Sequence, residues 1–68
     1  MRRPKLTETQ EEVLLLVGDG LTYPEIGAAR GTSASSADKT TRRLKEIFGV
    51  KRKSELVKVA HSYYTYNR

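Results

Sequence analysis

The pattern of apolar and polar residues divides the chain into four short amphipathic segments separated by turns that contain glycine. In the first segment, Thr7 and Gln10 form a capping box that predicts a helix start, and Gly-Asp-Gly at 18–20 predicts its end. Its apolar face consists of Val13, Leu14, Leu16 and Val17. The same device recurs at residues 22–25, where proline is tolerated in the first turn, and predicts a second, short helix that ends at Gly31.

The third segment, residues 34–48, predicts the longest helix, and Ser33 ahead of it has the hydroxyl of an N-cap. Small or apolar residues with helical spacing predict one buried stripe, formed by Ala37, Leu44, Ile47 and Phe48 with Thr40 and Thr41 between them. The other face is polar and mostly basic, and contains Ser35, Ser36, Asp38, Lys39, Arg42, Arg43 and Lys45. Hydroxyls and cations donate to phosphate oxygens and purine edges, so this face indicates a helix that lies in a DNA groove. Seen alone, a basic helix face is more often only a solvated surface.

Gly49 predicts the end of the third helix, and the apolar pattern predicts a fourth helix over residues 53–62. Its apolar residues cover more than one face, so we expect one face to join the core and the surplus to contact a second subunit or another protein. Burial of all of them in the core is the alternative. The candidate dimer or partner residues are Leu56, Val57, Ala60 and Tyr64.

The basic run at 51–53 fits a contact with the DNA backbone and a solvated loop equally well. Three of the four tyrosines lie in the tail at 63–68, where packing on the core or in a dimer is expected. A chain of 68 residues forms one domain with a modest core. The expected organisation is a basic arm at 1–5, a four-helix all-α domain at 6–62 and the tyrosine-rich tail at 63–68.

Charge is distributed unevenly along the chain. Residues 1–29 contain three basic and five acidic side chains, a balance of −2, whereas residues 30–68 contain ten basic and three acidic ones, a balance of +7. The basic half includes the third segment, and this asymmetry favours a polyanionic partner such as nucleic acid. An acidic protein surface would be attracted by the same field.

Several classes of function are disfavoured by composition. The chain has no cysteine and one histidine, which excludes thiolate metal sites and multi-histidine sites within one chain, so no metal or cofactor is expected. Titratable groups suited to acid–base chemistry do not converge in the pattern, and an enzyme is not expected. The longest apolar run, residues 13–17, is too short to span a membrane, and no secretory signal precedes it, so a cytoplasmic protein is expected.

In order, the motifs resemble the DNA-binding domain of the LuxR type, also called the LuxR/FixJ family. The matching stretches run at constant register from Leu6 to about Ala60, and only the ordered set is specific. They are Leu6-Thr7, Glu11 with Val13-Leu14, Gly20-Leu21-Thr22, Glu25-Ile26-Gly27, Gly31-Thr32-Ser33, Phe48-Gly49-Val50 and Glu55-Leu56-Val57.

This resemblance implies a four-helix helix-turn-helix domain whose third helix enters the major groove and whose fourth helix commonly pairs two subunits. By position, it implies that Asp38, Lys39 and Arg42 face bases, with the DNA backbone nearer to Ser33, Ser35, Ser36 and Arg43. The sequence departs from the family pattern at Arg30, where a buried leucine is usual, and at Thr32, Ala37, Thr40 and Arg52. The first four departures reduce the expected contact between the second and third helices.

Most members of that family have a receiver or ligand-sensing domain ahead of this one, so the resemblance implies a small stand-alone regulator, with an excised domain as the alternative. The leading hypothesis is a sequence-specific, DNA-binding transcriptional regulator that reads double-stranded DNA as a homodimer through residues 34–48. The alternative is an adaptor that binds RNA polymerase or another regulator through the fourth helix and the tyrosine tail.

Overall fold

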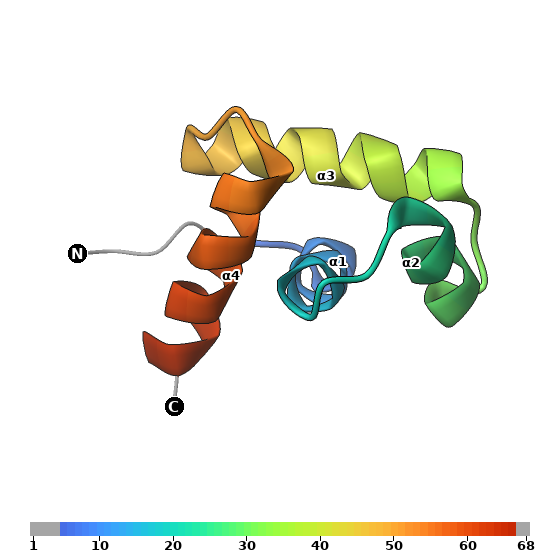
Figure 1. Ribbon diagram of the computed structural model, residues 1–68, viewed down its shortest axis with the longest axis horizontal. Helices are drawn as coiled ribbons and strands as arrows, with labels where there is room; N and C mark the ends of the chain where they lie inside the picture. Colours follow the sequence, from blue (N-terminus) through green and yellow to red (C-terminus); the bar gives the residue numbers. More distant parts are fainter. Residues whose placement is uncertain (1–4, 67–68) are drawn as a thin grey trace.

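The computed structural model describes residues 5–66, with side chains for residues 5–64. The described residues form four helices and no strand, which confirms the all-α four-helix prediction (Figure 1). The helices are α1 (Glu8–Gly18), α2 (Tyr23–Arg30), α3 (Ala34–Phe48) and α4 (Lys53–Tyr66). Apart from Lys5, the predicted basic arm lies outside the described residues, as do residues 67–68 of the predicted tail.

Local hydrogen bonds fix where the first three helices begin. The Thr7 hydroxyl accepts from the Gln10 backbone N–H at 3.1 Å while the Gln10 side chain accepts from the Thr7 N–H at 3.0 Å. Thr22 and Glu25 repeat this reciprocal arrangement at the start of α2. Ser33 accepts from the Ser36 N–H at 3.1 Å. All three predicted N-caps are therefore confirmed, because each depends on residues only three positions apart.

The fourth helix differs from its prediction at its C-terminal end. It begins at Lys53, but it continues to Tyr66 rather than ending at Ser62, so residues 63–66 are part of the domain rather than of a separate tail. Its N-terminus lacks a hydroxyl cap, because Arg52 stands at that position. The Glu55 carboxylate reaches back instead and accepts from the backbone N–H groups of Lys51 and Arg52, both at 3.0 Å.

The helices enclose one apolar core. In Figure 1, α1 is seen end-on beneath α3, with α2 and α4 on either side of it. Residues from all four helices contribute fully buried side chains to this core; the largest are Leu14, Ile26, Leu44, Leu56, Val13, Val17 and Thr41. Within the predicted stripe of α3, Ala37, Thr41 and Leu44 are buried, whereas Thr40, Ile47 and Phe48 are half-buried. Within residues 5–66, no helix has the length and apolar character needed to cross a membrane.

Candidate nucleic-acid interface

A short turn at residues 31–33 joins α2 to α3, and it depends on two glycines. Gly31 ends α2 in the left-handed region at φ 70°, which favours glycine, and the Thr32 N–H donates to the Gly27 carbonyl at 2.7 Å. Gly27 itself lies against the start of α3. A Cβ built on Gly27 would lie 2.6 Å from the Ser33 carbonyl carbon and 3.0 Å from the Ala34 nitrogen. The backbones of α2 and α3 therefore approach closely at a position where only glycine fits.

This close approach orients α3 with one face in the core and the opposite face outward. The outward face is not covered by another helix (Figure 1). Of the predicted DNA-binding residues, six are exposed on or beside it: Ser33, Ser35, Ser36, Lys39, Arg42 and Arg43. Asp38 lies at its edge and is half-buried. On the core side, the buried Thr41 hydroxyl donates to the Ala37 carbonyl at 2.8 Å, so it is satisfied within the helix.

Two acidic residues reduce the positive charge of this face. The Arg42 guanidinium lies 3.2 Å from the Asp38 carboxylate, one turn earlier, and the Arg43 guanidinium lies 3.3 Å from the Glu46 carboxylate. No ion pair of Lys39 is found among the described residues. Because Arg42 and Arg43 remain mostly exposed, both guanidinium groups keep donors available for phosphate or base oxygens.

Tyr23 and Lys53 support this face from the neighbouring helices. The Lys53 ammonium donates to the Leu21 carbonyl at 2.8 Å and lies 4.8 Å from the centre of the Tyr23 ring. Tyr23 in turn is close enough to Thr41 and to the Asp38–Arg42 pair of α3 for these groups to affect its pKa. Burial raises the pKa of Tyr23, the Asp38 carboxylate raises it further, and Arg42 and Thr41 act in the opposite direction. The Tyr23 hydroxyl therefore stays protonated and uncharged near the Asp38–Arg42 pair.

Sequence reasoning did not identify Tyr23 or Lys53 as supports of the site. Neither lies in the third segment, and neither spacing nor charge distinguishes them from ordinary surface residues. In the predicted basic run at 51–53, Lys51 and Arg52 are exposed, whereas Lys53 is half-buried and engaged with the α1–α2 turn. The run therefore offers two cations to a ligand rather than three.

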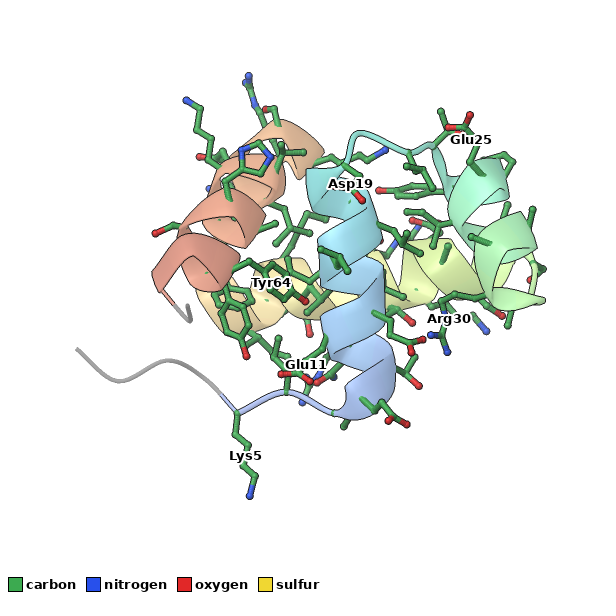
Figure 2. All side chains as sticks on the ribbon, turned by 90° about the horizontal axis from the view of Figure 1, so that it is seen from below. Lys5, Glu11, Asp19, Glu25, Arg30 and Tyr64 are labelled. Carbon is green, nitrogen blue, oxygen red and sulfur yellow. The ribbon has the colours of Figure 1, made fainter. Side chains whose placement is uncertain are left out.

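Arg30 lies away from this face and joins α2 to α1. Its guanidinium pairs with the Glu12 carboxylate and donates to the Thr9 hydroxyl at 3.5 Å (Figure 2). The Arg30 side chain is only 20% exposed, and its charged end reaches the acidic start of α1. At position 30, where the LuxR-type pattern has a buried leucine, this chain therefore has an arginine that links α2 to α1 through an ion pair.

The predicted partner surface on α4 is narrower than expected. Leu56 and Ala60 are 0% and 1% exposed, so they belong to the core and are not available to a partner in this structure. Val57 and Tyr64 are half-buried and also pack against the core, and the Tyr64 hydroxyl donates to the Glu11 carbonyl of α1 (Figure 2). The reason is that α4 packs across α1, with these side chains at the contact. The exposed residues of α4 are mainly polar and include Ser54, Lys58, His61 and Ser62.

Comparison of this chain with protein-family models, with curated proteins and with solved structures finds no match. The resemblance to the LuxR-type domain stays a prediction from the sequence motifs.

Proposed function

We propose that this protein is a sequence-specific DNA-binding transcriptional regulator that reads the major groove with the outward face of α3. Lys39 and Arg42 are the base-reading candidates, because lysine and arginine donate to the O6 and N7 atoms of guanine. The serines at the N-terminal end of α3 and Arg43 are assigned to phosphates. The role is binding rather than catalysis, and DNA binding would place the protein in the cytoplasm with the DNA.

The observation that carries this proposal is the junction of α2 with α3. A short second helix, a left-handed glycine and a close backbone contact at Gly27 hold a longer helix with a hydroxyl-rich, basic face turned outward. A helix presented in this way has the dimensions to enter the major groove, which admits an α-helix. A rigid junction also matters for function, since base readout requires the side chains to be held in register with the base edges.

We also propose that the regulator acts as a homodimer on DNA. One helix of this kind reaches only a few base pairs, and two copies on an inverted repeat double the number of base contacts. Because Leu56 and Ala60 lie in the core, the surface available on α4 consists of the exposed polar residues with Val57 and Tyr64 at its edge. The adaptor function, with RNA polymerase or another regulator as partner, relies on this same small surface.

The test is selection from a randomised pool of DNA duplexes, followed by binding measurements on the selected sequence. Lys39→Ala or Arg42→Ala should cost about 1–3 kcal/mol of binding free energy and relax the preference at one base position. The matched control is Lys5→Ala, which removes the same charge from an exposed position outside α3 and α4 and should leave the preference intact.

Measuring DNA affinity at two salt concentrations separates contacts to phosphates from contacts to bases. Phosphate attraction weakens steeply with salt, whereas base readout keeps its ratio between sequences. Enrichment of an inverted repeat would support a dimeric regulator. Equal losses on all sequences would make Lys39 and Arg42 phosphate contacts, and a pool without enrichment would contradict the proposed function and favour the adaptor.

A further inference from the structure

Asp38 and Arg42 form an ion pair at the edge of the outward face of α3. The Arg42 guanidinium nitrogen lies 3.2 Å from the Asp38 carboxylate oxygen, and the two residues are one helical turn apart. Their exposure differs, since the Asp38 side chain is 34% exposed and the Arg42 side chain is 70% exposed. The carboxylate therefore sits at the base of the pair, and the guanidinium extends from it toward solvent.

The Asp38 carboxylate also acts electrostatically on the neighbouring helix α2. The Asp38 carboxylate raises the pKa of Tyr23 on α2, and the neighbouring Thr41 hydroxyl donates to the Ala37 carbonyl at 2.8 Å. Lys53 of α4 lies over the Tyr23 ring and donates to the α1–α2 turn, which holds that ring in place. The charged and titratable groups around the carboxylate are thus Arg42 on its own helix, Tyr23 on α2 and, behind the Tyr23 ring, Lys53 on α4.

We propose that Asp38 is a positioning residue, which holds the Arg42 guanidinium in one orientation and thereby makes Arg42 the specificity-determining side chain of this face. The inference rests on the proposed DNA-binding function. It assigns Asp38 a role other than accepting from a base or only repelling phosphate. Lys39, which has no ion pair among the described residues, then supplies attraction with less discrimination.

The chemistry of arginine and lysine supports these different roles for Arg42 and Lys39. A guanidinium has five N–H donors in a planar fork, so one edge can bind Asp38 while the other still donates to both guanine acceptors. Fixing the fork before binding removes part of the rotamer entropy that a long side chain otherwise loses on binding. A lysine ammonium is a flexible point charge and gains much less from being held.

The Arg43–Glu46 pair on the same helix provides a matched control. Its two groups are 3.3 Å apart, but both side chains are mostly exposed, at 66% and 71%. Glu46→Ala and Asp38→Ala each remove one negative charge from α3 and free one arginine. A difference between these two variants therefore reports on positioning and not on net charge.

The experiment compares binding of the selected duplex with binding of duplexes changed at each base position, for the wild type and for Asp38→Ala, Glu46→Ala and Arg42→Ala. We expect Arg42→Ala to lose roughly tenfold discrimination at one position and Asp38→Ala to lose about threefold or more at that same position. Asp38→Ala combined with Arg42→Ala should discriminate no worse than Arg42→Ala alone. Glu46→Ala should raise affinity for all duplexes and leave discrimination unchanged.

Asp38→Glu keeps a carboxylate one turn before Arg42 and should restore most of the discrimination, and thermal unfolding of each variant shows that the fold is retained. If Asp38→Ala changes the affinity for every duplex by the same factor as Glu46→Ala, then Asp38 acts only through its charge and the inference is wrong.

A measurement on the free protein separates this inference from the proposed function. NMR relaxation of the arginine Nε–H groups should show Arg42 more restricted than Arg43 in the wild type, and as mobile as Arg43 in Asp38→Ala. Equal mobility of the two arginines in the wild type overturns the inference whatever the DNA result. A wild type without sequence preference, but with a restricted Arg42, contradicts the proposed function and the assignment of Arg42 to specificity while it supports the positioning by Asp38.

Discussion

Two helix junctions of this domain, α2 with α3 and α1 with α4, are built in different ways. Between α2 and α3, backbone lies against backbone, because a Cβ on Gly27 would meet the Ser33 carbonyl carbon at 2.6 Å. Between α1 and α4, side chains fill the space, with Leu14 and Val17 facing a core that includes Leu56. A glycine is present here too, but a Cβ on Gly18 would meet the Ala60 Cβ at 2.8 Å, which is a side-chain atom.

The two junctions therefore have different roles: one fixes the orientation of α3, and the other stabilises the domain. A backbone contact leaves little freedom, so the α2–α3 junction fixes the angle at which the basic face of α3 is presented. A layer of large side chains buries apolar surface and supplies most of the stabilisation, but it can adjust by small shifts. The proposed function thus depends most on the junction that contributes fewer large buried side chains.

The largest expected effect is that of Gly27→Ala. The new Cβ has no space without movement of the turn, and overpacking costs about 1–3 kcal/mol, of which the better helix propensity of alanine offsets up to about 1 kcal/mol. We expect a lower melting temperature, by roughly 5–10 °C for a domain of this size, and weaker DNA binding. Thermal unfolding followed by circular dichroism measures the first effect. A variant as stable as the wild type would contradict the account of this junction.

Gly18→Ala should destabilise the α1–α4 junction by a smaller amount. Its obstacle is the Ala60 Cβ, so adding Ala60→Gly removes the clash and should make the double variant more stable than the sum of the two single changes by about 0.5–1 kcal/mol. No such rescue exists for Gly27, because its neighbours are backbone atoms. If the stability changes of Gly18→Ala and Ala60→Gly simply add, then a change at a neighbouring side chain does not rescue Gly18→Ala, and the two junctions do not differ in this way.

Tyr64→Phe removes one hydrogen bond from the α1–α4 junction. Burial raises the pKa of Tyr64, with Glu11 and Tyr63 acting in the same direction, so its hydroxyl stays a neutral donor to the Glu11 carbonyl. Loss of this bond should reduce the free energy of unfolding by about 0.5–1.5 kcal/mol in denaturant titration. The base preference should not change, since the α2–α3 junction is untouched. Base preference is the readout here, because Tyr64 borders the proposed dimer surface and overall affinity also depends on that surface. A changed base preference would be the contrary result.

The smallest effect concerns Glu25, at the start of α2. Hydrogen bonds from the Thr22 backbone and side chain lower its pKa below the usual 4.5, so its contribution to stability is present above that pH and is lost as the pH falls through the lower, folded value. Glu25→Gln keeps a side-chain acceptor without a titrating group. Its unfolding free energy should depend less on pH in this acidic range than that of the wild type, and identical pH profiles would contradict the role of Glu25.

Much of the fold could be predicted because its signals are local. The capping boxes at Thr7 and Thr22, the cap at Ser33 and the left-handed glycine at 49 each involve residues within one helical turn, and all are found in the structure. Hydrophobic periodicity likewise placed most of the buried residues, including Thr41, whose hydroxyl is satisfied by its own helix. The exposed candidates on α3 followed from the same periodicity.

The structural features that could not be predicted from the sequence depend on contacts between residues far apart in the chain. The extension of α4 to Tyr66 follows from Tyr63 packing in the core and Tyr64 reaching α1, and the burial of Leu56 and Ala60 has the same cause. Likewise, the pairing of Arg30 with Glu12 and the electrostatic effect of Asp38 on Tyr23 arise only when α2 meets α1 and α3. Hydrogen bonds within a turn are set by neighbouring residues, whereas these contacts exist only once the helices have packed.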